Sequence, residues 1–202
     1  MADIVALKAE LGRLGTATEL GFEAGGEAIE RIKMLAEALE AANPTPVTTR
    51  ADALLHGRWR LLYSSFGLQR DTTLARLAFN QLPKTAIHVD ALWQEVDPAT
   101  GLYDNVIDFS SADGPGINVT LGKYTADADQ RLGVEFFASL VAPTTGSSVG
   151  RHQIELDTRK FPALYSDVTY LDADFRLNRG SFGNLYVLQL VDRTPTGWSR
   201  DL

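Results

Sequence analysis

The chain has 202 residues, of which 45% are hydrophobic and 22% charged, a balance typical of one globular domain. Its formal net charge is −7 and no basic patch is visible, which argues against a nucleic-acid partner. The sequence contains no cysteine, so disulfides, thiolate metal ligands and thiol nucleophiles are excluded.

The N-terminal stretch MADIVALKAELGRL resembles neither a signal peptide nor a transit peptide, because it contains acidic residues and lacks a long apolar core. No run of about 18 apolar residues follows it, so no membrane-spanning helix is expected. We therefore expect a cytoplasmic protein, with peripheral contact to a membrane left open.

Residues 1–46 are expected to form a two-helix segment packed on the rest of the chain. Apolar residues recur at steps of three and four from Ile4 to Leu14, and again from Ala28 to Leu39. Glycines separate these two stripes. The sequence NPTP ends the second stripe, because proline cannot continue a helix.

Residues 47–202 are expected to be mainly β. From Gly57 onward apolar and polar residues alternate in about eight or nine short runs, separated by turn sequences such as DPATG at 97–101. This pattern predicts an antiparallel barrel or sandwich. Residues 72–82 are predicted to form a short helix or an irregular lid.

Gly57 and Trp59 open the first of these strands. A glycine lets the chain turn sharply into a barrel, and the tryptophan then closes one end of it. Lipocalin-type barrels begin in the same way, and an arginine from a terminal strand commonly crosses the tryptophan face. Arg176 or Arg193 would supply that contact.

The densest cluster of charge lies near the C-terminus. Asp172, Asp174, Arg176 and Arg179 fall within eight residues, next to Gly180. Two arginines beside two aspartates favour a structural network that holds a turn. Contact with a ligand head group and acid–base chemistry are the alternatives.

Signatures of catalysis are missing from the sequence. It contains no nucleophile elbow, no phosphate-binding glycine loop and no zinc-protease motif. His56, His88 and His152 lack the spacing of metal ligands. We expect neither an enzyme nor a bound metal or cofactor; an enzyme using Asp172 or Asp174 on an apolar substrate is the less favoured alternative.

Three blocks resemble the plastid-lipid-associated protein (PAP)/fibrillin family. The first runs from IERIKMLAEALEAANPTP to LLHGRWRLLYSSF, the second is DPATGLYDNVIDF, and the third is TYLDADFRLNRGSFGNLYVL. Together they span most of residues 28–192. The resemblance implies a lipocalin-like β-barrel that carries hydrophobic molecules such as lipids, carotenoids or prenylquinones.

The expected function is therefore binding of a small hydrophobic molecule in a barrel cavity. The predicted ligand-binding residues are Trp59, Leu61, Tyr63, Asn105, Phe109, Phe136, Tyr170 and Arg176; the predicted structural network is Asp172, Asp174, Arg179 and Gly180. Asn105 and Gln189 are polar residues within apolar strands, which suits a pocket for a ligand with one polar end, although backbone groups can also satisfy a buried amide.

The alternative function is a structural or interaction module whose barrel is filled by its own side chains. It would act through its outer surface, on a membrane or a protein. Strand alternation alone does not separate the two hypotheses, because a shift of one residue exchanges the inward and outward faces.

Overall fold

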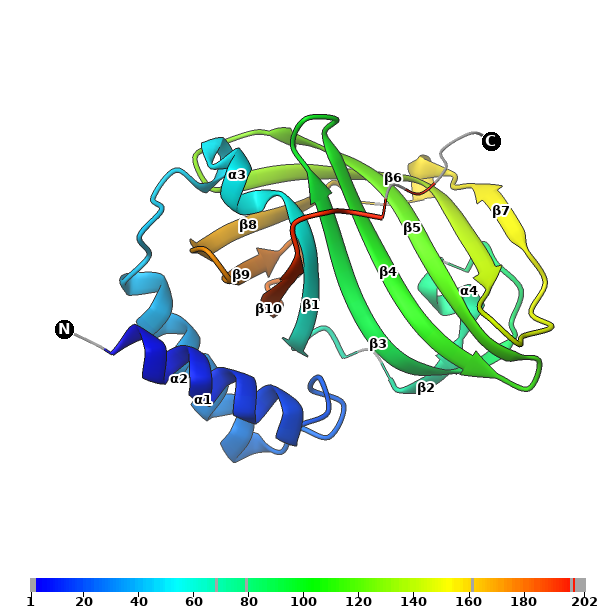
Figure 1. Cartoon of the computed structure of the whole chain (residues 1–202), viewed down its shortest axis with the longest axis horizontal. Helices are drawn as coiled ribbons and strands as arrows, with labels where there is room; N and C mark the ends of the chain where they lie inside the picture. The colour runs from blue at the N-terminus through cyan, green and yellow to red at the C-terminus, as the bar shows by residue number, and fades with distance from the viewer. Residues whose placement is uncertain (1–2, 68, 79, 161, 197, 199–202) are drawn as a thin grey trace.

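The computed structural model describes residues 3–67, 69–78, 80–160, 162–196 and 198. It confirms a mainly β fold in which antiparallel strands close into a barrel, preceded by two N-terminal helices (Figure 1). Its helical elements are α1 (Ile4–Ala17), α2 (Gly26–Ala41), η1 (Thr48–Arg50), α3 (Asp52–Leu55), α4 (Leu74–Leu77) and η2 (Thr158–Lys160).

Eight strands close the barrel. In chain order they are β1 (Gly57–Ser64), β3 (Ala86–Asp97), β4 (Leu102–Ser111), β5 (Gly114–Ala126), β6 (Arg131–Pro143), β8 (Leu164–Leu171), β9 (Phe175–Gly180) and β10 (Leu185–Asp192). Their order around the barrel is β1-β10-β9-β8-β6-β5-β4-β3, and β3 pairs back with β1. Two short strands extend this sheet: β2 (Asp71–Thr73) beside β3, and β7 (His152–Glu155) beside β6.

The two helices cover the outer face of β1, β8, β9 and β10. Helix α1 begins where the Asp3 carboxylate accepts a hydrogen bond from the backbone N–H of Ala6, at 3.1 Å. The buried stripes of α1 and α2 meet outward-facing strand residues in one apolar cluster, formed by Leu11, Leu14, Ile32, Leu35, Ala36, Leu39, Tyr63, Tyr170, Phe175, Leu177, Leu185 and Val187. We call this the helix-side cluster.

A second apolar cluster, the tail-side cluster, covers the outer face of β4, β5 and β6. Its buried members are Val106, Val119, Leu121, Ala138 and Leu140, and Trp198 packs against it. The chain after β10 crosses this face (Figure 1). It is fixed there by Glu95, whose carboxylate accepts hydrogen bonds from the backbone N–H of Thr196 at 2.9 Å and from its hydroxyl at 2.7 Å.

The closed end of the barrel is built around Gly57 and Trp59. Gly57 has φ of +139°, and a Cβ at this position would lie 2.5 Å from the carbonyl oxygen of Asp192. The fully buried Trp59 donates its indole N–H to the Leu55 carbonyl at 2.9 Å. This arrangement of glycine and tryptophan at the start of the first strand is the one expected from the sequence.

Bulges change which face of a strand points inward. The pairing of β1 with β10 shifts between Leu61 and Tyr63, and the pairing of β8 with β9 shifts between Val168 and Tyr170. Both tyrosines consequently point outward into the helix-side cluster. Because helices and tail cover the outside, strands of this barrel carry apolar residues on both faces.

None of the helices in the described residues combines the length and the apolar character needed to cross a bilayer.

Candidate ligand-binding cavity

A cavity of about 280 Å³ lies inside the barrel. Most of its wall is apolar, contributed by Leu20, Phe22, Leu61, Phe66, Leu77, Leu92, Ile107, Val134, Phe136 and Leu164. Polar side chains occupy a smaller part of the wall, as in pockets that hold an apolar molecule by burial and orient it by a few polar contacts.

The cavity exists because β1 and β3 pair over only a short stretch. Their pairing covers Gly57–Arg60 of β1, after which β1 follows β10 and the two strands separate. The loop between α1 and α2 covers the gap, since Leu20 bridges to Tyr63 and its carbonyl accepts the N–H of Ser64 at 2.9 Å. Leu20 itself has a left-handed backbone with φ of +64°, an uncommon conformation for a leucine.

Two exposed phenylalanines stand at the mouth. Phe66 is 52% exposed and Phe182 is 64% exposed, and both line the cavity. Their ring centroids lie 6.2 Å apart, so the rings contact each other across the opening. The mouth therefore presents an apolar surface to solvent.

The floor of the cavity carries a polar cluster. Gln94 and Tyr103 line the cavity; behind them Arg176 Nη2 donates to Gln94 Oε1 at 2.6 Å, and Asn178 Nδ2 donates to the same oxygen at 3.3 Å. Arg176 is fully buried, and its guanidinium carbon lies 4.8 Å from the centroid of the Trp59 ring. Burial lowers the pKa of Arg176 to about 10, so the group keeps its charge at pH 7.

The charge of the lining contrasts with that of the whole chain. None of the described lining residues is an aspartate, a glutamate or a lysine, and Arg76 at the mouth is the one formally charged side chain among them. The chain as a whole carries a net charge of −7. The cavity is thus an acid-free region of an acidic protein.

Four residues proposed from the sequence line this cavity. Leu61 and Phe136 belong to its apolar wall, and Asn105 is a polar group in mid-wall. Gly180, assigned from the sequence to the structural network, also lies at the lining, and its N–H donates to the Asn184 carbonyl at 2.9 Å.

Five others lie elsewhere. Trp59 and Arg176 form the closed end beneath the floor, and Phe109 is buried in the barrel core away from the cavity lining. Tyr63 and Tyr170 face the helices on the outside of the barrel. The last two positions reflect the bulges described above.

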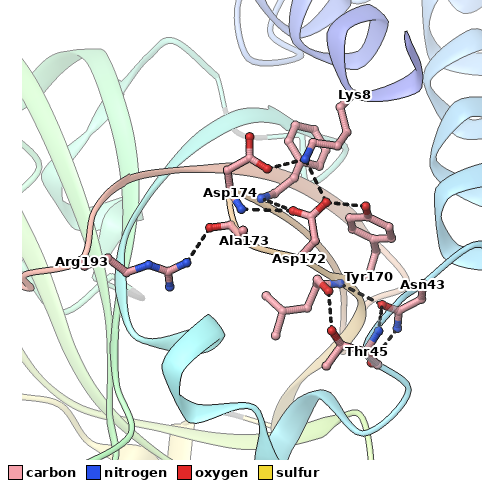
Figure 2. Close-up of polar contacts among 10 residues, drawn as sticks. Lys8, Asn43, Thr45, Tyr170, Asp172, Ala173, Asp174 and Arg193 are labelled. Carbon is pink, nitrogen blue, oxygen red and sulfur yellow. Dashed lines mark hydrogen bonds and ion pairs between the residues drawn. The ribbon is translucent and has the colours of Figure 1, made fainter. Parts of the chain in front are cut away.

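The two aspartates of the C-terminal block join helix α1 to the β8–β9 turn (Figure 2). Lys8 Nζ lies 2.9 Å from Asp172 Oδ2 and also pairs with Asp174. Asp172 accepts further hydrogen bonds from the Tyr170 hydroxyl at 2.6 Å and from the backbone N–H of Phe175 at 2.9 Å. Neither aspartate is among the residues that line the cavity.

Arg179 and Arg193 have separate structural contacts. Arg179 pairs with Glu40 of α2 rather than with the neighbouring aspartates. Arg193 Nη1 donates to the carbonyls of Ala53, Leu54 and His56 at 2.8–2.9 Å, and its guanidinium carbon lies 5.8 Å from the centroid of the Trp59 ring. Both arginines proposed from the sequence to cross Trp59 therefore do so.

Part of the floor was not predicted from the sequence. Gln94 on β3 and Asn178 on β9 were absent from the predicted ligand-binding residues, whereas Arg176, which donates to Gln94, was among them. Gln189, proposed as an inward polar residue, is exposed on the outer face. The available signal was the run Arg-x-Asn-x-Gly at 176–180, which places polar and small residues on one face of a strand.

Two other features do not form comparable sites. A shallow groove of about 700 Å³, open to solvent, follows β2 and β3 on the outside of the barrel, with His88 and Asp71 on its wall. In the described part of the chain, no group of three or more histidine, cysteine, aspartate or glutamate side chains is placed to hold a metal ion.

The chain is similar to plant proteins associated with plastids. It is 29% identical over 210 residues to a probable plastid-lipid-associated protein 3, chloroplastic, from Arabidopsis thaliana, covering 85% of this chain and 54% of the relative. It is 26% identical to a light-induced protein, chloroplastic, from Solanum tuberosum, covering 93% and 68%. It is 28% identical to a chromoplast-specific carotenoid-associated protein C1 from an Oncidium hybrid cultivar, covering 85% and 64%.

The chain thus spans between about half and two thirds of the length of these relatives. No solved structure matches it. The expectation of a cytoplasmic location is wrong, because the relatives are chloroplastic or chromoplastic proteins and point to a plastid.

The family resemblance is confirmed over nearly the whole chain. The PAP_fibrillin family model matches residues 5–189, a range that includes nearly all of both helices and of the barrel. This protein belongs to the PAP/fibrillin family.

Proposed function

We propose that this protein binds a small hydrophobic molecule in the barrel cavity, with the polar end of the ligand at the floor. The observation that carries the proposal is the mostly apolar cavity of about 280 Å³, which opens between two phenylalanines. Burial of apolar ligand surface would supply most of the affinity, at about 25 cal/mol per Å².

The size of the cavity limits what it encloses. Pockets for small molecules usually measure about 300–1,000 Å³, so this one lies at the lower end of the range. A ligand with a long apolar tail would leave part of that tail at the mouth, against Phe66 and Phe182. The carotenoid-associated and lipid-associated names of the relatives support a ligand of this hydrophobic class.

The proposal is tested by filling the cavity. Thr120 lines it on β5, and Thr125 is exposed on the same strand, so Thr120→Phe and Thr125→Phe form a matched pair. Binding of a fatty acid, a quinone and a carotenoid is measured by native mass spectrometry, and folding by thermal unfolding. We expect wild type and Thr125→Phe to bind at least one probe and Thr120→Phe to lose it. Equal binding by both variants, or no binding by wild type, would refute the proposal.

A second candidate function is contact of the mouth with a lipid surface. Phe66 and Phe182 are the observation in its favour, since exposed aromatic rings at an opening suit insertion between lipids. Flotation with phosphatidylcholine vesicles compares Phe66→Ser/Phe182→Ser with Val5→Ser/Val191→Ser, which removes two exposed apolar side chains outside the cavity lining. Loss of flotation in the first variant alone supports the candidate; equal behaviour of the two variants rejects it.

A further inference from the structure

We propose that the ligand of this cavity is a carboxylic acid, bound as its anion with the carboxylate at the floor against hydrogen-bond donors organised by Arg176. This inference rests on the proposed function and names the ligand class more closely. It follows from three features of the floor: an unsatisfied buried cation, the direction of its hydrogen bonds, and the absence of acidic side chains.

Arg176 is a buried cation without an anionic partner among the described residues. Its side chain is fully buried, and it forms none of the salt bridges of the described chain. Nη2 donates to Gln94, whereas Nε and Nη1 have no hydrogen-bond partner in the described chain. A buried charge in this state is costly, so the site gains from an anion that approaches it.

The contact with Trp59 does not explain this state. Arg193 crosses the same ring and donates four hydrogen bonds to backbone carbonyls, of Ala53, Leu54, His56 and Ala173. Arg193 is therefore an arginine at Trp59 whose guanidinium is already hydrogen-bonded. Arg176 is a second cation at the same ring, and its Nε and Nη1 have no hydrogen-bond partner in the described chain.

The hydrogen bonds of the floor leave donors facing the cavity. Gln94 Oε1 accepts from both Arg176 and Asn178, so the amide nitrogen is the group that remains to donate. The Tyr103 hydroxyl oxygen lies 3.5 Å from Asn178 Nδ2 and accepts from it, so its O–H is directed elsewhere. Both Gln94 and Tyr103 line the cavity, and an acceptor oxygen suits this arrangement better than a donor.

The absence of acidic residues from the lining makes the acceptor an anion. A carboxylate on the ligand would meet no aspartate or glutamate in the described lining, and Gln94, which it would contact, is hydrogen-bonded to the charged Arg176. A neutral ester or alcohol would meet the same donors without neutralising that charge. The acid is expected to bind about tenfold to hundredfold more tightly, the usual gain of a hydrogen bond to a charged group over a neutral one.

The first experiment compares three probes of equal chain length on the wild-type protein: dodecanoic acid, methyl dodecanoate and dodecanol. Affinities are measured by isothermal titration calorimetry at pH 7. Tighter binding of the acid supports the inference. Equal affinities keep the proposed function and reject the carboxylate, whereas no binding of any probe rejects both.

The second experiment removes the charge at the floor. Arg176→Met keeps the length of the side chain, and replacing an unpaired buried charge by an apolar group is often neutral for folding. The matched control, Arg13→Met, removes an exposed arginine of α1. We expect Arg176→Met to bind acid and ester equally and Arg13→Met to keep the preference for the acid. If Arg176→Met folds and retains that preference, the inference is wrong.

A variant at the mouth tests the orientation of the ligand. Arg76 is exposed and lines the cavity, so it would pair with the ligand carboxylate if that group stayed at the opening. Arg76→Gln is expected to keep the preference for the acid. Loss of the preference in Arg76→Gln, with Arg176→Met unaffected, would place the carboxylate at the mouth and overturn the assignment to the floor.

Discussion

Glu40 on α2 and Arg179 on β9 form a two-pronged ion pair across the boundary between the helices and the barrel. Arg179 Nε lies 2.8 Å from Oε1 of the carboxylate, and Nη2 lies 2.9 Å from Oε2. Both side chains are less than one-third exposed. The pair therefore fixes α2 to the barrel in one orientation, and it does so on the strand that also carries the floor of the cavity.

This pair is expected to stabilise the fold measurably. In a double-mutant cycle of Glu40→Gln and Arg179→Gln, we expect a coupling energy of about 1–2 kcal/mol, because the pair is bidentate and partly shielded from water. The free energy of unfolding in urea gives this value. The matching cycle of Glu10 and Arg13, an exposed pair on α1, should give a smaller coupling. Equal couplings in the two cycles would contradict the role given to Glu40.

The Asp172 site should make stability depend on pH. Burial opposes ionisation of Asp172, but hydrogen bonds from the Tyr170 hydroxyl and from Lys8 outweigh it, so its pKa falls below the ordinary value of 3.8. The unfolded chain then binds its proton at a higher pH than the folded chain does. The stabilisation is complete above a pH of about 4 and is lost as the pH falls through the folded pKa.

Asp172→Asn is accordingly expected to destabilise the protein at pH 7 and to approach wild type in acid. Urea unfolding at several pH values between 2.5 and 7 measures the difference. Asp90→Asn, which changes an exposed carboxylate on β3 bonded to Ser110, is the control and should destabilise the protein less at pH 7. A deficit of Asp172→Asn that stays constant down to pH 2.5 would show that its carboxylate charge is not the cause.

Gly57→Ala should be strongly destabilising. The residue has φ of +139°, and the added Cβ would lie 2.5 Å from the Asp192 carbonyl oxygen. Strained backbone of this kind costs about 1–3 kcal/mol before the collision is counted. Gly12→Ala in α1 has no atom within 4 Å of the new Cβ and should stabilise the protein by about 0.5–1 kcal/mol. Thermal unfolding compares the two, and an unchanged midpoint for Gly57→Ala would contradict the geometry.

Trp198→Ala should expose the tail-side cluster. Trp198 packs against this cluster on the outside of the barrel. Its removal is expected to increase binding of a dye such as ANS and to promote self-association, measured by light scattering, because exposed apolar patches drive association. Thr196→Ala removes one hydrogen bond to Glu95 but keeps the indole, and it should have the smaller effect. If Trp198→Ala scatters light as wild type does and binds no extra dye, the indole does not protect this face.

The fold could be predicted from local sequence signals. For several strands, however, these signals do not show which face points into the barrel. The step of three and four in the first helices, the glycine before Trp59 and the DPATG turn each act over a few residues, and the structure contains all three features. The direction of Tyr63 and Tyr170 depends on bulges, which a pattern of alternation does not reveal. Gln189 faces solvent for a related reason: the outside of β10 is covered by helices over only part of its length.

The cavity was predictable only in part. Leu61, Asn105 and Phe136 line it, whereas Gln94 and Asn178 at the floor were not predicted, because alternation does not tell which face of a strand points inward. In an isolated sheet the apolar face is the buried one. Here the helices bury the outside as well, so polarity no longer indicates direction, and only the three-dimensional structure separates the two faces.

The helices and the tail cover the outside of the barrel, while the cavity lies on its inside, and this separates the positions at which substitutions act. Residues that line the cavity and residues that hold the helices or the tail alternate along the same strands, so most substitutions affect one set and leave the other unchanged. Gln94 and Phe136 line the cavity, whereas Leu177 and Val187 belong to the helix-side cluster. The shape of the cavity and the anchoring of the outer layers are therefore set largely by different residues of the same strands.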